Sequence, residues 1–125
     1  MLQIGTNNLG HGPSSAADTL AGIRRVVEVV RTQCPRARIV LCALFPRGTH
    51  LNEARGEGLQ VNQALASSPD ERVEFVDVGW KFIGPDGDLR KDLMADELHP
   101  SAAGYALWAQ DLEPAARRAL AAAGG

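Results

Sequence analysis

An uninterrupted apolar run in the middle of the chain constrains its fold more than any other feature. Residues 39–45 read Ile-Val-Leu-Cys-Ala-Leu-Phe, and Pro46 follows directly. The run is too short for a typical helix and has no polar face, so it predicts a strand that is buried on both sides. Strands of this kind lie at the centre of parallel sheets, whose two faces are covered by helices.

The segments on either side of this run alternate between strand and helix patterns. In chain order, we expect the end of a strand at residues 1–4, a helix over about 15–33, the strand at 39–45, a helix over about 53–67, a strand at 73–78 and a final helix that begins at Pro100 or Ser101. Such alternation predicts a layered α/β domain with a parallel sheet and right-handed crossovers. The chain of 125 residues is expected to form a single domain, 1–125. Pro114 is expected to kink or restart the final helix, and the tail at about 121–125 to be disordered.

Three loops follow strands of the expected sheet. Asn7 lies in the first, the second comes after Phe45, and Asp96–His99 lies in the third. Ligand sites of parallel α/β sheets lie beyond the carboxyl ends of the strands. We therefore expect these loops to gather at one end of the sheet and to form the functional site.

Asp96, His99 and Asn7 supply the chemistry of this site. A carboxylate can fix the tautomer of a histidine three residues away, and a histidine held in this way is a general base near neutral pH. The amide of Asn7 can donate a hydrogen bond to an oxyanion. The alternatives are that Asp96 is a surface acid, that His99 caps the following helix, and that Asn7 caps its own backbone.

Two motifs carry a resemblance to a known family. They are Gly5-Thr6-Asn7-Asn8 and Asp96-x-x-His99-Pro100-Ser101-x-x-Gly104-Tyr105. Together they resemble the third and fifth conserved blocks of the SGNH, or GDSL, hydrolases. The middle of the chain (Leu44-Phe45-Pro46-Arg47-Gly48, Asn52, Arg55 and Val61-Asn62) is similar to the branch of this family that contains the platelet-activating factor acetylhydrolase catalytic subunits. Asn8 departs from the aspartate of the general pattern, as in that branch.

The resemblance implies a three-layer, flavodoxin-like fold and the hydrolysis of small, acetyl-like esters without a cofactor or metal. Asn7 would be an oxyanion donor, His99 the general base and then acid, and Asp96 the residue that orients His99. The nucleophilic serine of the G-D-S block is not found in this chain, which resembles the C-terminal portion of a family member and lacks the strands before it.

Other serines and cysteines are poor replacements for that nucleophile. Ser14, Ser15 and Ser101 are expected to cap helices, Ser67 and Ser68 to end one, Cys42 to lie in the core and Cys34 at a helix end. Three possibilities stay open: a serine from another polypeptide, direct activation of water by His99, and a non-catalytic remnant of an esterase. A flavodoxin-like nucleotide binder is a weaker alternative, because no nucleotide-binding fingerprint is present.

The remaining features limit partners and location. A net charge of −2 gives no reason to expect nucleic acid or an anionic membrane, and no apolar run spans a bilayer. The absence of a signal peptide and the use of cysteine favour the cytoplasm. His11, His50 and His99 lack zinc-site spacing.

Because the first strand would leave an open edge, we expect a homo-oligomer or a companion segment to cover it. The aromatic residues Trp80, Phe82 and Trp108 are expected in the core.

Overall fold

A computed structural model describes residues 1–10, 14–68 and 70–124 of the chain. Its elements are the 3-10 helix η1 (Thr6–Asn8), helix α1 (Ala16–Gln33), strand β1 (Ile39–Cys42), helix α2 (Glu53–Ala66), strand β2 (Val73–Val76), the 3-10 helix η2 (Gly79–Phe82) and helix α3 (Ala102–Ala123). The alternation of strands and helices predicted from the sequence is confirmed.

β1 lies at the centre of a small parallel sheet. It pairs with β2 in a register that places Ile39 opposite Val73 and Cys42 opposite Val76. On its other side, the backbone N–H of Leu2 donates to the carbonyl of Val40 at 2.8 Å, and the N–H of Cys42 donates to the carbonyl of Leu2 at 2.8 Å. All four residues of β1 are buried, as the apolar run predicted, although the strand ends at Cys42 and not at residue 45.

The two outer strands are shorter than expected. At residues 1–4 the predicted strand is reduced to a single bridge between Leu2 and Leu41. Among the described residues this segment has a pairing partner on one side only, so few hydrogen bonds hold it in an extended ladder. β2 ends at Val76, two residues before the predicted end at residue 78.

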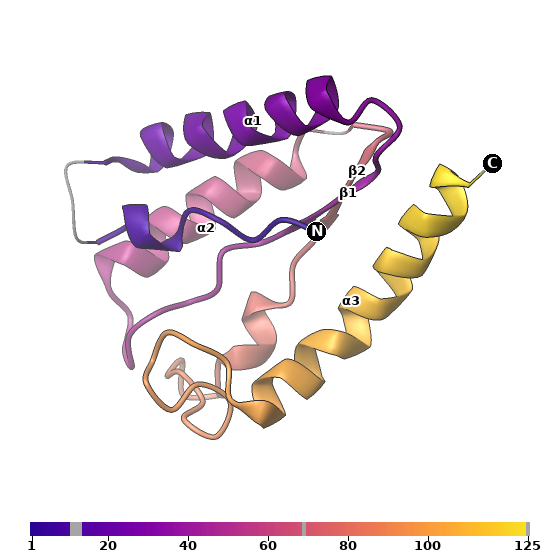
Figure 1. Ribbon diagram of the computed structural model, residues 1–125. Coiled ribbons are helices and arrows are strands. Elements are labelled where there is room, and N and C mark those ends of the chain that lie inside the picture. Colours follow the sequence, from indigo (N-terminus) through magenta and orange to yellow (C-terminus); the bar gives the residue numbers. More distant parts are fainter. Residues whose placement is uncertain (11–13, 69, 125) are drawn as a thin grey trace.

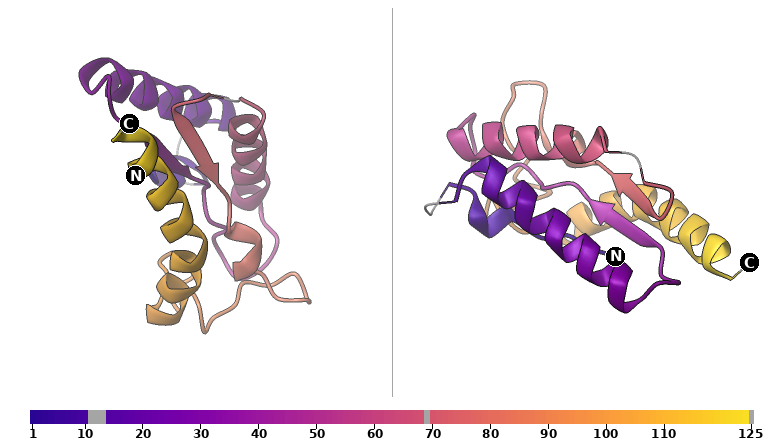
Figure 2. Two further views of the ribbon diagram at one scale, coloured as in Figure 1. Left: turned by 90° about the vertical axis from the view of Figure 1, so that its right-hand side faces the viewer. Right: turned by 90° about the horizontal axis from the view of Figure 1, so that it is seen from above.

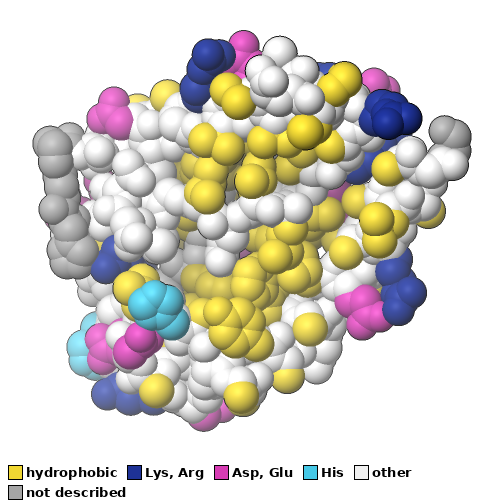
Figure 3. Space-filling view, viewed as in Figure 1, with side chains coloured by type: hydrophobic (Ala, Val, Ile, Leu, Met, Phe, Trp, Pro, Cys, Tyr) yellow, Lys and Arg dark blue, Asp and Glu magenta, His cyan; other side chains and the backbone are white. Residues whose placement is uncertain are grey.

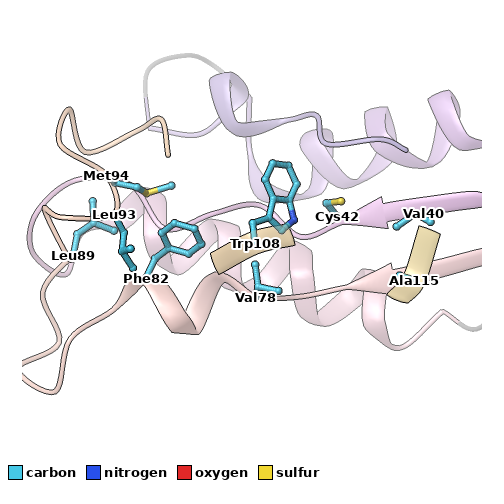
Figure 4. Close-up of a cluster of buried hydrophobic side chains, with 9 residues drawn as sticks. All are labelled: Val40, Cys42, Val78, Phe82, Leu89, Leu93, Met94, Trp108 and Ala115. Atoms are coloured by element: carbon cyan, nitrogen blue, oxygen red, sulfur yellow. The ribbon is translucent and has the colours of Figure 1, made fainter. Parts of the chain in front are cut away.

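Helices cover both faces of the sheet, which confirms the three-layer α/β fold. α1 and α2 lie on one face and α3 on the other (Figures 1 and 2). The alternation of side chains along β1 divides the core in the same way. Ile39 and Leu41 pack in the cluster beneath α1 and α2. Val40 and Cys42 pack on the opposite face with Trp108 and Ala115 of α3 (Figure 4).

Local sequence signals fix where the helices begin. The Ser15 hydroxyl accepts a hydrogen bond from the N–H of Asp18, whose carboxylate accepts one from the N–H of Ser15, which completes a capping box. The side chain of Asn52 caps α2 by accepting from the N–H of Arg55 at 3.0 Å. Ser101 caps α3 by accepting from the N–H of Gly104 at 3.2 Å. The expected starts of α1 and α2 are correct to within one residue, and α3 begins one or two residues after its expected start at Pro100 or Ser101.

Three further sequence expectations, on Pro114, the C-terminal tail and Trp80, differ from the structure. α3 is one helix from Ala102 to Ala123 with the exposed Pro114 inside it, so Pro114 does not restart the helix. The alanine-rich sequence after Pro114 has a high helix propensity, and the helix continues three residues into the tail that was expected to be disordered. Trp80 was expected in the core but is 69% exposed, whereas Phe82 and Trp108 are buried.

The start of α3 is packed tightly against the segment before it. A Cβ atom at Gly104 would lie 2.3 Å from the carbonyl oxygen of Leu93 and 3.2 Å from the ring of Phe82. Only glycine allows this approach. The Ser101 hydroxyl also donates to the carbonyl of Asp92 at 2.7 Å. These contacts fix the point at which the Asp96–His99 loop joins α3.

Candidate active site

Asn7 and His99 line the same pocket, which has a volume of about 130 Å³. Its walls come from η1, from the segment that follows β1 at Leu44 and Phe45, and from the loop before α3. Tyr105 of α3 completes the wall. The loops that the sequence placed at one end of the sheet therefore meet there.

Asp96 lies behind His99 and holds it through both carboxylate oxygens. One oxygen, Oδ2, is 2.7 Å from Nδ1 of the His99 ring. The other, Oδ1, accepts the backbone N–H groups of His99 at 2.7 Å and of Leu98 at 3.1 Å. These bonds, with the backbone N–H of His99 contributing most, lower the pKa of Asp96 to about 2. Asp96 is therefore ionised at neutral pH.

The ionised carboxylate determines which ring nitrogen of His99 can act as a base. A carboxylate only accepts hydrogen bonds, so Nδ1 carries the proton that it shares with Asp96. In the neutral ring this leaves the lone pair on Nε2. Asp96 and His99 thus form the carboxylate–imidazole pair that general base catalysis requires.

The pair is strongly exposed to solvent. The side chains of His99 and Asp96 are 71% and 57% exposed. An ion pair at this exposure contributes little to stability. The alternative that His99 caps α3 is not supported, because Ser101 is the N-cap residue.

Asn7 is available as a hydrogen-bond donor. It lies in η1, which follows Gly5 at φ 109°, a conformation that favours glycine. The Asn7 side chain is exposed, and its amide forms no hydrogen bond within the part of the chain that the structure describes. The alternative that Asn7 caps its own backbone therefore has no support among these residues.

Most serines of the chain have structural roles. Ser15 and Ser101 cap helices, as predicted, whereas Ser14 precedes the Ser15 cap and is not the cap residue of α1. The hydroxyl groups of Ser67 and Ser68 donate to backbone carbonyls of α2. In the described part of the chain, no serine or cysteine lines the pocket of Asn7 and His99.

Neither cysteine lines the pocket, whereas two side chains with hydroxyl groups do. Cys42 is buried in β1, and burial raises the pKa of its thiol to about 11, which makes it a poor nucleophile. Cys34 is an exposed free thiol at the end of α1. Thr6 and Tyr105 place hydroxyl-bearing side chains on the pocket wall. Both residues stand in the two motifs that carry the family resemblance, but their position on the wall depends on η1 and on the first turn of α3.

A second histidine forms a similar pair at another place. Nδ1 of His50 lies 2.8 Å from Oδ1 of Asp88, and both residues are outside the pocket of Asn7 and His99.

His11 lies outside the described residues. Among the residues that are described, no three histidine, cysteine or acidic side chains are grouped to hold a metal ion. Within the same residues, no helix has the length and apolar character needed to cross a membrane.

Comparisons with known proteins identify the family to which the chain belongs. Residues 1–107 match the GDSL-like lipase/acylhydrolase family. The chain is 38% identical over 109 residues to platelet-activating factor acetylhydrolase IB subunit alpha1 from Homo sapiens, and the match covers 84% of this chain and 45% of that protein. It is 33% identical over 108 residues to subunit alpha2 from Gallus gallus, covering 85% of this chain and 46% of that protein.

Solved structures give the same result. A Streptococcus pneumonia protein described as a platelet activating factor superposes with a TM-score of 0.74 at 28% identity, covering 90% of this chain and 56% of the other. The esterase domain of the ORF1 protein from the zebrafish ZfL2-1 retrotransposon gives a TM-score of 0.68 at 25% identity, covering 94% and 67%. The chain spans about half the length of the curated relatives that it matches. The chain belongs to the GDSL-like lipase/acylhydrolase family.

Proposed function

We propose that this chain carries the acid–base and oxyanion-binding half of an esterase site that acts on small, acetyl-like esters. The observation that carries the proposal is that His99, held through Nδ1 by an ionised Asp96, shares a pocket with Asn7, whose amide forms no hydrogen bond among the described residues. The family and its acetylhydrolase members support ester hydrolysis as the reaction. No cofactor or metal is required for this chemistry.

Each residue has a defined role in the proposed reaction. Nε2 of His99 removes the proton of the attacking hydroxyl group and later returns it to the leaving alcohol. The amide of Asn7 donates to the oxyanion that forms when the ester carbonyl is attacked. Asp96 keeps the proton on Nδ1 and stabilises the imidazolium ion that forms between these two steps.

We propose that the nucleophilic serine comes from outside this chain. No serine or cysteine among the described residues lines the pocket. The backbone next to the pocket offers a place for a further strand, because the segment around Leu2 pairs with β1 on one side only among the described residues. Hydrophobic side chains also gather on the surface between α1 and α3, with a histidine at the margin of this patch (Figure 3).

A companion segment that carries the serine, or a second copy of the chain, would cover this edge and patch. Light scattering at micromolar concentration distinguishes the two. A dimer or larger oligomer supports the second copy, whereas a monodisperse monomer contradicts self-association and leaves the companion segment.

Cys34 and Cys42, both free thiols, support a reducing, cytoplasmic location.

Hydrolysis of p-nitrophenyl acetate by the purified chain tests the role of His99. Without a serine, His99 can still activate water directly, at a rate far below that of an esterase with a covalent intermediate. His99→Ala should then reduce hydrolysis to the rate in buffer. His50→Ala is the matched control, since it removes the other exposed histidine that pairs with a carboxylate. Equal rates for the wild-type chain and His99→Ala would support a non-catalytic remnant instead.

A further inference from the structure

Glu97 has the strained backbone conformation that shapes the Asp96–His99 turn. Its φ of 64° makes it the non-glycine residue with positive φ among the described residues. Non-glycine residues rarely adopt this conformation, and the glutamate side chain does not favour it as the shorter side chains of asparagine and aspartate do. The turn at Glu97 brings the N–H groups of Leu98 and His99 back to the Asp96 carboxylate. Some contact outside the turn must therefore hold Glu97 in place.

The loop after β1 provides these contacts. The hydroxyl group of Thr49 donates to the Glu97 carboxylate. The backbone N–H of Gly48 donates to the Glu97 carbonyl at 3.0 Å. Lys91 lies nearby, with its ammonium nitrogen 3.9 Å from the same carboxylate. Both the backbone and the side chain of Glu97 are thus bound by a loop that is distant in sequence.

Arg55 in turn holds this loop. Its side chain is buried on α2, at 5% exposure, which is uncommon for arginine. One terminal nitrogen donates to the carbonyls of Gly48 at 2.8 Å and Thr49 at 2.9 Å, and the other donates to the carbonyl of Gly87 at 2.9 Å. Since each of these bonds ends on a loop backbone, the guanidinium acts as a fixed anchor for the loop.

We propose that Thr49 and Glu97 are positioning residues, and that their contact holds His99 in the geometry of a general base. The inference rests on the proposed function, because it concerns the same site. The exposed Asp96–His99 pairing contributes little energy and does not by itself hold the ring rigidly. Its geometry is instead set by contacts that run from α2 through Arg55 and the Thr49 loop to Glu97.

Nitrogen NMR of the His99 ring tests this directly, because it reports which ring nitrogen carries the proton. In the wild-type chain near pH 8, His99 should be predominantly protonated on Nδ1. Thr49→Val removes the hydroxyl donor at nearly constant shape, and it should shift the ring toward the mixture of tautomers found in free histidine. Thr49→Ser restores the hydroxyl group and should restore the wild-type spectrum. Thr32→Val is the control, since its hydroxyl group bonds to the backbone of α1 far from the site.

A double variant separates positioning from a loss of folding. Glycine adopts positive φ without strain, so Glu97→Gly should make the Thr49 contact unnecessary. The variant Thr49→Val/Glu97→Gly should therefore recover most of the Nδ1-protonated form that Thr49→Val loses. A His99 ring in Thr49→Val that is unchanged from wild type would overturn the proposal, as would a double variant no better than Thr49→Val. These spectra require no turnover, so a failure of the esterase proposal would be seen separately in the hydrolysis assay.

Discussion

Asn62 offers the sharpest test of how the fold fixes the wall of the pocket. Its side chain on α2 is 6% exposed and forms two hydrogen bonds with the same residue of the neighbouring segment. Oδ1 accepts the backbone N–H of Leu44 at 2.8 Å, and Nδ2 donates to the Leu44 carbonyl at 2.9 Å. Leu44 follows β1 and lines the pocket of Asn7 and His99. Asn62 therefore replaces the strand partner that Leu44 lacks.

The expected cost follows from those two bonds. Asn62→Ala leaves a buried N–H and a buried carbonyl without partners, and each unsatisfied group costs about 1–3 kcal/mol. The sum of about 2–6 kcal/mol is a large share of the roughly 5–15 kcal/mol by which a domain is usually stable. Asn62→Asp keeps the acceptor for the Leu44 N–H but loses the donor, and it places a charge in a buried site, so it should also destabilise the fold.

Urea unfolding followed by circular dichroism measures this change as a shift of the midpoint at constant slope. Asn8→Ala is the control, because Asn8 is exposed and its loss should change the free energy of unfolding by less than about 0.5 kcal/mol. A destabilisation below about 1 kcal/mol for Asn62→Ala would contradict the proposed role of Asn62, since it would mean that water replaces both bonds at little cost.

Three further predictions follow from the structure. The Asp96 carboxyl should titrate in carbon NMR with a midpoint of about 2, and a midpoint near 4 would contradict the geometry. Because the folded pKa of Asp96 is lowered, its contribution to stability is present at pH values above its unfolded pKa and is lost as the pH falls through about 2. Gly104→Ala should lower the melting temperature strongly, because the added Cβ meets a backbone carbonyl. Gly56→Ala has open space around the added Cβ in α2 and should stabilise the chain by about 0.5–1 kcal/mol. Equal effects of the two variants would show that the start of α3 can move. Cys34 should react readily with a thiol reagent, while Cys42 should react only on unfolding; fast modification of both would show that β1 is not buried as described.

The sequence predicted those parts of the fold that depend on local patterns. The apolar run at 39–45 has no polar face, and this is sufficient to place it in the centre of a covered sheet. The helix starts at Ser15 and Ser101 follow from short side chains that accept backbone N–H groups. The meeting of Asn7 and His99 follows from topology, because the carboxyl ends of parallel strands share one edge.

Other features depend on distant contacts that leave little trace in the sequence. The segment at residues 1–4 has the composition of a strand, but its extent depends on how many neighbours pair with it. Arg55 and Asn62 contributed to the family resemblance, yet their bonds to loop carbonyls and to Leu44 become visible only in the structure. The strained backbone of Glu97 likewise cannot be inferred from a residue type that has no preference for it.

The most direct test of the account is to treat the purified chain with a fluorophosphonate probe and to measure its intact mass. The oxygen of an activated serine, of the kind that a histidine base produces, displaces fluoride from the probe and forms a phosphonate ester. If the nucleophile comes from outside this chain, the mass is unchanged, because the pocket beside His99 contains no serine or cysteine among the described residues. A phosphonate adduct on a serine of this chain would contradict it, since the base and the nucleophile would then lie in the same polypeptide.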